Sequence, residues 1–333
     1  MSGPRETRYG PWLVALGAAL WGTESAWRIP LDQVFDADVM VLWEHVILVA
    51  CALPFILPRL GELRRARWQT LAWLGFSGVA GSAVGTIFFT LALKRETIVS
   101  FDRIASFLSA IGADSAAGAV PRDEVVNATV INVVLNIQPV LSTVAAWLFF
   151  RDRLARGFYP WAALAVACGV VLAIGDGRVI YGVEYALLTA LLWGLSTVAG
   201  RGVMVELSLP LAAGMRVVIG LVATFAIVAV RGGLSMDALW PAAAAVAPGK
   251  TVTWLLLLAI LSGGLPLVVY FAGLARTRAS TAGYFEMLQT LAAAAITWTF
   301  FGDALAPHQL AAGVVLIGAV AMVQRAQSQT AES

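Results

Sequence analysis

The stretch Leu135-Asn-Ile-Gln-Pro-Val-Leu-Ser-Thr-Val-Ala-Ala-Trp-Leu-Phe-Phe-Arg-Asp-Arg-Leu154 returns later as Glu286-Met-Leu-Gln-Thr-Leu-Ala-Ala-Ala-Ala-Ile-Thr-Trp-Thr-Phe-Phe-Gly-Asp-Ala-Leu305. Gln138 corresponds to Gln289 and Trp147 to Trp298, both at one offset of 151 residues. Both copies are too apolar for a soluble surface. An internal duplication in a membrane protein predicts two related halves that face one central site.

The composition of the whole chain is that of a membrane protein. Hydrophobic residues make up 60% of the 333 positions and charged residues 13%, with a mean hydropathy of +0.83. A soluble protein carries roughly 25% charged residues. The apolar runs approach the roughly 20 residues that a helix needs to cross a bilayer. We therefore predict an all-α polytopic membrane protein.

The hydrophobic runs predict ten transmembrane helices. Those of the first half are expected near Trp12–Trp27, Val39–Leu57, Leu71–Leu93, Asn127–Phe150 and Phe158–Ile174. Those of the second half are expected near Tyr185–Met204, Leu211–Val230, Val252–Leu274, Ser280–Phe301 and Gln309–Val323. The basic loop Arg64-Arg65-Ala-Arg67 favours cytoplasmic termini by the positive-inside rule, in a bacterial inner membrane.

The repeat extends beyond the opening pair. Ala19-Leu20-Trp21-Gly22 returns as Leu191-Leu192-Trp193-Gly194 at an offset of 172 residues. Because each half has an odd number of helices, the second half must insert upside down, which predicts two inverted five-helix repeats. We place them at residues 1–176 and 177–324, followed by a cytoplasmic tail at 325–333. A change of offset isolates an extra segment, about 95–127, on the extracytoplasmic side.

These residues resemble a known family. The Ala-Leu-Trp-Gly start, Gln138-Pro139 and the Trp-Leu-Phe-Phe-Arg-Asp-Arg-Leu stretch are similar to the EamA-type branch of the drug/metabolite transporter superfamily. The resemblance implies a ten-helix carrier of amino acids or other small metabolites, many members being exporters. The segment Arg151-Asp152-Arg153 matches the family pattern, whereas Gly302-Asp303-Ala304 lacks its basic residues.

Charged residues inside the predicted helices are candidates for substrate binding or coupling, because a charge in a bilayer needs a partner or a watery cavity. Glu24 and Arg28 have the spacing of a local ion pair, so Glu24 either neutralises Arg28 or accepts a proton or a substrate amine. Glu44 and Arg216 are equivalent positions of opposite charge. They either bind the two ends of a zwitterion or anchor their helix ends.

Polar residues of the fourth and ninth helices form a second set of candidates. Asn132 and Asn136 share one helix face and precede Gln138, while the ninth helix carries Tyr284, Glu286 and Gln289. They could contact substrate or simply hydrogen-bond between helices. We rank Glu286 first, because an isolated carboxylate at mid-membrane needs either a function or a dedicated partner, and if desolvation keeps it protonated it suits proton coupling. Trp21 and Trp193 either line the cavity or serve as packing residues.

Glycine and proline positions predict hinges and close helix packing. These are Pro139, Gly81, Gly85, Gly263, Gly264 and Pro266.

The function predicted from these features is secondary active transport, in the direction of export, of a small metabolite such as an amino acid by alternating access, with protons as a candidate coupling ion. We expect a monomer or homodimer in the lipid bilayer that needs no cofactor, metal or nucleic acid. A non-transporting sensor that uses the external insertion is the alternative. An intramembrane enzyme is disfavoured, since no Gly-x-Ser-x-Gly, His-Glu-x-x-His or phosphate-binding loop occurs.

Overall fold

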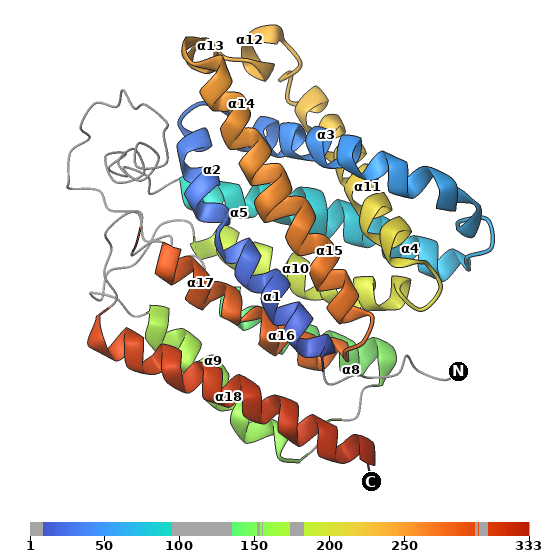
Figure 1. Ribbon diagram of the computed structural model, residues 1–333, viewed down its shortest axis with the longest axis vertical. Coiled ribbons are helices and arrows are strands. Elements are labelled where there is room, and N and C mark those ends of the chain that lie inside the picture. Colours follow the sequence, from blue (N-terminus) through green and yellow to red (C-terminus); the bar gives the residue numbers. More distant parts are fainter. Residues whose placement is uncertain are drawn as a thin grey trace.

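The protein is an elongated bundle of helices in the computed structural model (Figure 1). The structure describes residues 9–94, 135–151, 154, 156–173, 183–296, 299 and 306–332. All regular elements in these ranges are helices. The predicted all-α class is therefore confirmed. The external insertion, about 95–127, lies outside the described residues.

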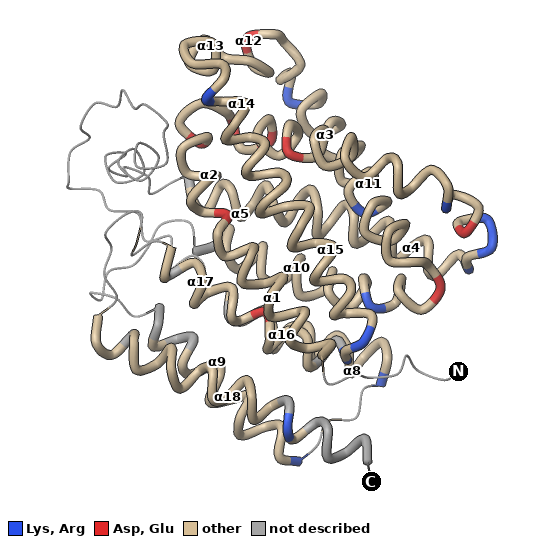
Figure 2. The backbone as a smooth tube through the Cα atoms, in the orientation of Figure 1, with Lys and Arg blue, Asp and Glu red and all other residues tan. Residues whose placement is uncertain are grey.

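Five helical stretches are long and apolar enough to cross a membrane. They are Ala37–Glu62, Trp68–Leu93, Tyr185–Val203, Leu209–Val230 and Pro248–Leu274. Shorter apolar helices occupy Gln138–Phe150, Phe158–Cys168 and Leu310–Val323. The chain is thus a multi-pass membrane protein. Charged positions gather mainly near the ends of the bundle, with few along the helices (Figure 2).

Most helices begin and end close to the predicted boundaries, but the last one continues to Glu332, through most of the tail predicted at 325–333. The first half contains α1 (Gly10–Gly22), α2 (Glu24–Asp32), α3 (Ala37–Ile56), α4 (Trp68–Phe76), α5 (Gly85–Lys94), α8 (Gln138–Phe150) and α9 (Phe158–Ala173). The second contains α10 (Val183–Val203), α11 (Leu209–Val230), α14 (Pro248–Leu256), α15 (Leu265–Leu274), α16 (Ala279–Glu286), α17 (Leu288–Ile296) and α18 (Pro307–Glu332). Two short helices, α12 (Met236–Leu239) and α13 (Ala242–Val246), lie between α11 and α14.

Three of the predicted membrane helices are interrupted. The first breaks between α1 and α2, where the Thr23 hydroxyl donates to the Leu20 carbonyl at 2.7 Å and helps to close the end of α1. The fourth changes from a 3₁₀ turn to α8 at Gln138, because Pro139 lacks an N–H and fits the first turn of a helix. The ninth breaks after Glu286. Broken helices at membrane depth are typical of transporter binding sites.

The third helix of each half contains a π-helical segment. These segments are η2 (Ser77–Val84), between α4 and α5, and η4 (Leu257–Gly264), between α14 and α15. Both are eight residues long. A π segment widens the helix by taking an extra residue into a turn, and such segments are frequent at functional sites.

The halves pack through matching pairs of helices. Helix α3 packs antiparallel on α11. The direction is evident from the contact between Asp38, near the start of α3, and Arg231, just after the end of α11. Helix α1 packs on α15, and α10 packs on α5; α9 pairs with α18, and α8 with α16. These pairings leave a central space to which both halves contribute side chains.

Candidate functional site

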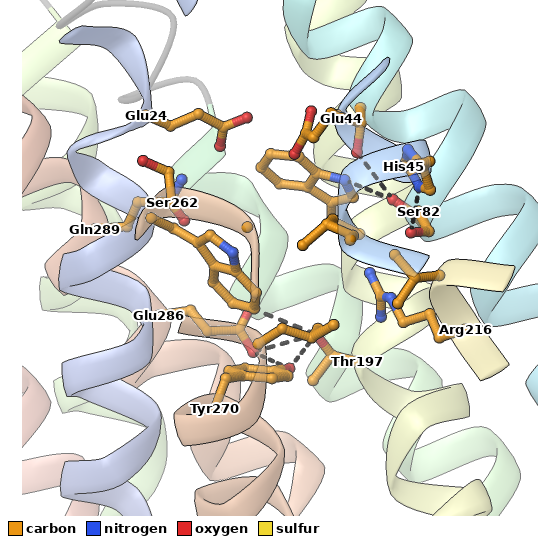
Figure 3. A pocket seen from close by; sticks show the side chains of 18 of the residues that line it. Glu24, Glu44, His45, Ser82, Thr197, Arg216, Ser262, Tyr270, Glu286 and Gln289 are labelled. Atoms are coloured by element: carbon orange, nitrogen blue, oxygen red, sulfur yellow. Dashed lines mark hydrogen bonds between the residues drawn. The ribbon is translucent and has the colours of Figure 1, made fainter. Parts of the chain in front are cut away.

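A cavity of about 720 Å³, counted to its open mouth, lies at the centre of the bundle (Figure 3). Ten of the residues predicted from the sequence line it: Trp21, Glu24, Glu44, Gly81, Gln138, Trp193, Arg216, Gly263, Glu286 and Gln289.

Other predicted residues lie elsewhere. Tyr284 does not line the cavity; its ring is buried and meets Phe158 of α9 edge-on, with the ring centres 5.2 Å apart. Asn132 and the side chain of Asn136 lie outside the described residues. The remaining hinge candidates stand near the cavity but not on its wall: Gly85, Pro139, Gly264 and Pro266.

One wall of the cavity carries a buried ion network. Arg28 is fully buried, and its Nη2 donates both to Glu24, one turn earlier, and to Glu44 of α3, at 2.8 Å from Glu44 Oε2. Its Nη1 donates to the hydroxyl of Thr90 at 2.9 Å. The local pair expected from the spacing is present, but Glu44 completes it from another helix. Two carboxylates therefore share one guanidinium.

Arg216 stands on a different wall and has no such partner. Its Nη1 donates to two hydroxyls, at 3.1 Å to Ser77 and 2.9 Å to Ser196, and its guanidinium lies 5.9 Å from the ring centre of Phe271. In the part of the chain that the structure describes, no carboxylate oxygen lies within 4.0 Å of Arg216. Among the described residues its hydrogen bonds go only to neutral hydroxyls, and such a cation inside a membrane bundle can bind an anionic group of a ligand.

Glu286 is held entirely by neutral donors. The hydroxyls of Tyr270 and Thr197 donate to Glu286 Oε1 at 2.8 and 3.1 Å, and the Gln138 amide donates to Oε2. These donors come from α15, α10 and α8, so the carboxylate ties three helices to the end of α16 (Figure 3). Gln138 and Glu286 also line a second pocket of about 230 Å³.

His45 also lines the cavity, although the sequence did not single it out. Its Nδ1 lies 2.8 Å from the Val41 carbonyl, and its Nε2 lies 2.9 Å from the Ser82 hydroxyl. Because a carbonyl only accepts hydrogen bonds, Nδ1 carries a proton and Nε2 is free to accept from Ser82. The ring is thus tied to its own helix and to η2.

Two tryptophans from equivalent positions of the halves border the cavity. Trp21 packs on Tyr270 with ring centres 4.7 Å apart, and the Trp193 indole N–H donates to the Gly81 carbonyl at 3.0 Å. The amide nitrogen of Gln289 is buried and has no hydrogen-bond partner within the described ranges of the chain. An unpaired buried donor on a cavity wall indicates where an acceptor of a ligand would bind.

Hydroxyl side chains are the part of the site that the sequence did not reveal. Thr197, Tyr270, Ser82, Thr86 and Ser262 all line the cavity. A signal was present for two of them: Thr197 follows Trp193 by one helical turn, and Tyr270 replaces the phenylalanine found at the equivalent position, Phe89, in the first half. Among the described residues, no group of His, Cys, Asp and Glu could hold a metal ion.

Known proteins with similar sequences are transporters. The model of the EamA-like transporter family matches residues 180–325. The riboflavin transporter ImpX of Fusobacterium nucleatum subsp. nucleatum is 20% identical over 325 residues, covering 95% of this chain and 97% of that protein. The resemblance to the EamA-type branch is thereby confirmed.

A solved structure shares the fold. One protein of known crystal structure aligns with a TM-score of 0.65 at 17% identity, over 98% of this chain and 100% of that one. The alignment covers the cavity-forming helices of both halves. The family match and the relative named as a transporter, by contrast, point to a membrane transporter rather than an enzyme.

Proposed function

We propose that this EamA-like membrane transporter is a secondary active carrier of a small zwitterionic metabolite, and that the central cavity is its substrate site. The observation that carries the proposal is the distribution of charge on the cavity wall. Two carboxylates share Arg28 on one side, and Arg216 stands without a carboxylate partner on the other. A ligand with one charge of each sign would neutralise both walls.

An amino acid has this charge pattern. Its carboxylate would bind Arg216, whose planar guanidinium suits a two-oxygen acceptor. Its ammonium group would bind beside Glu24 and Glu44, which carry one more negative charge than Arg28 balances when both are ionised. Glu44 and Arg216 would then bind the two ends of the zwitterion, as their equivalent positions and opposite charges in the two halves suggest.

Riboflavin-like ligands are a second candidate. The relative named as a riboflavin transporter aligns over nearly its full length. The favouring observation here is that the cavity also presents Trp21, Trp193 and the unpaired amide of Gln289, which suit a flat ring bearing hydrogen-bond acceptors. Riboflavin has no carboxylate, so a dependence on Arg216 separates the two candidates.

Transport would follow from rocking of two inverted five-helix repeats, residues 1–176 and 177–324. The helix pairings support this arrangement, because the contact of α1 with α15 has its counterpart in that of α10 with α5. The π segments η2 and η4 occupy equivalent helices, and both contribute residues to the cavity. Repeats that share a midplane site can alternate its access by moving as rigid bodies.

Glu286 is the proposed site of the coupling proton. It is buried, ends a broken helix, and lies between the central cavity and the smaller second pocket. Protonation would remove its charge and weaken its hold on Tyr270 and Thr197, which connects proton binding to the position of α16 relative to α15 and α10. In the proposed orientation both termini are cytoplasmic in a bacterial inner membrane, and the direction is export.

The test begins with thermal unfolding of the purified protein in the presence of single amino acids or riboflavin. A ligand that binds the folded state raises the unfolding temperature. The stabilising ligand is then used in a flux assay with protein reconstituted in liposomes, with and without a pH gradient. Saturable flux that responds to the gradient supports a proton-coupled carrier. Stabilisation without flux in either direction would instead favour the alternative of a non-transporting sensor.

A further inference from the structure

At one end of the α3–α11 pair, a carboxylate from each half of the chain contacts the other half. Glu62, in the turn that follows α3, accepts hydrogen bonds from the backbone N–H of Ser208 at 2.7 Å and from the Ser208 hydroxyl at 2.8 Å. Glu206, in the turn before α11, accepts from the backbone N–H of Arg67 at 2.9 Å and forms an ion pair with the Arg67 side chain. Each half thus supplies a carboxylate to the other.

These contacts are placed where two helices begin. Ser208 is the N-cap residue of α11 and Arg67 is that of α4, and neither caps its helix with its own side chain. The first N–H groups of a helix lack partners within it and favour negative charge. In a capping box, a glutamate of the same helix reaches back to this N–H. Here the glutamate comes from the other half of the protein.

A different contact holds the opposite end of the same helix pair. Asp38, in the first turn of α3, accepts from Arg231 Nη1 at 3.0 Å, and Arg231 follows the last turn of α11. Because α3 and α11 are antiparallel and belong to different halves, contacts at both ends join one half to the other. If an end of the cavity opens by separation of the two halves, the contacts at that end break.

We infer that Glu62, Ser208, Arg67 and Glu206 form a latch that closes the cavity at the end carrying the basic α3–α4 turn, and that Asp38 and Arg231 oppose it at the other end. This inference rests on the proposed alternating access. The latch groups border water, with the Arg67 side chain 53% exposed and that of Glu206 20% exposed. Water can therefore replace the lost hydrogen bonds when the halves separate, which makes opening reversible.

The charge of Glu206 gives the latch a pH dependence. Its hydrogen bond with the backbone N–H of Arg67 holds the pKa of Glu206 below its usual range. The charged groups that face it are Arg67, Arg65 and Glu62, from the α3–α4 turn. Because the pKa is lowered in the latched form, the latch is complete above the usual glutamate pKa of about 4.3 and weakens as the pH falls through the lowered value.

The experiment measures access to the cavity without any substrate. A single cysteine is placed by Thr86→Cys, on the cavity wall, after Cys51→Ala and Cys168→Ala. A membrane-impermeant maleimide is applied to inside-out and right-side-out vesicles. Losing one capping acceptor should raise labelling from the latch side about 5-fold in Glu62→Ala or Glu206→Ala, and about 25-fold in the double variant if the free-energy effects add.

Control variants separate a latch from general loosening. Asp38→Ala should raise labelling from the opposite side and lower it from the latch side. Asp237→Ala, which removes an exposed carboxylate of α12 at the same end as Asp38 but outside the Asp38–Arg231 ion pair, should change neither. Unchanged labelling in the double variant, or an equal rise from both sides, would overturn the latch while leaving alternating access intact. If the cysteine is labelled from neither side in any variant, alternating access fails and the latch fails with it.

Discussion

Arg28→Gln and Arg216→Gln should have different consequences, the first for the stability of the fold and the second for ligand binding. Arg28 balances two buried carboxylates, whereas Arg216 donates only to serine hydroxyls. Arg28→Gln leaves Glu24 and Glu44 side by side without a cation, whereas Arg216→Gln leaves no buried carboxylate within salt-bridge distance unpaired among the described residues. The first change should therefore damage the fold, and the second should damage ligand binding.

The sizes of the two effects follow from these contacts. Removing one partner of a buried ion pair costs about 3 to 5 kcal/mol of folding free energy. Arg216→Gln keeps an amide that can bond to a serine, so its cost in stability should stay near 1 kcal/mol, the usual value of a neutral hydrogen bond. A ligand carboxylate, in contrast, loses a charged partner that contributes about 1.5 to 3 kcal/mol. An amino-acid ligand should therefore bind about 10- to 150-fold more weakly.

Both quantities can be measured on the same purified variants. Thermal unfolding in detergent gives the stability, and titration of the ligand-induced rise in unfolding temperature gives the affinity. Arg216→Lys serves as the charge-preserving control and should recover part of the affinity for an amino acid. The reasoning would be refuted if Arg216→Gln unfolds as readily as Arg28→Gln, or if it binds an amino-acid ligand as tightly as the unmodified protein does.

Two further substitutions probe the proton site and the π segment. In Glu286→Gln an amide N–H replaces a carboxylate oxygen and faces another donor, so the free energy of unfolding should fall by about 1 to 3 kcal/mol. The response of ligand flux to a pH gradient should also be lost. A retained response would show that Glu286 does not couple transport to protons. In Gly81→Ala the new Cβ would lie 2.1 Å from Ser196 Oγ. This clash should displace Arg216, which bonds to Ser196, and weaken ligand binding more than tenfold. Gly75→Ala is the control: no atom lies within 4 Å of its new Cβ, so it should bind the ligand normally in the same titration.

The positions of the helices were largely predictable because the membrane imposes a simple pattern. The expected helix Phe158–Ile174 is observed as Phe158–Ala173, and Val39–Leu57 as Ala37–Ile56. Apolar length marks each helix, and glycine, proline or charge marks its end. The break after Glu286 and the π segments were not predictable in this way, because they alter the backbone within an apolar run without changing its composition.

The candidate site was predictable where a charge or amide stands out against an apolar background. Glu24, Arg216 and Glu286 were found on that basis, and the structure places all three on one cavity. Their partners were harder to find. Glu44 reaches Arg28 from another helix, and Tyr270 reaches Glu286 across 16 positions of the chain, so only the packing of the helices brings them together. Serine and threonine hydroxyls occur often enough in membrane helices that their presence alone carried no signal.

The measurement that tests the central claim most directly is exchange of a labelled ligand across liposomes that contain the purified protein. The ligand is one that stabilises the protein, and unlabelled ligand is enclosed at high concentration. A carrier with one alternating central site predicts saturable uptake that is accelerated by ligand on the opposite side and that needs about 10- to 150-fold more of an amino-acid ligand in Arg216→Gln. Uptake that does not saturate, or that is indifferent to ligand on the opposite side, would contradict a single alternating site in this cavity.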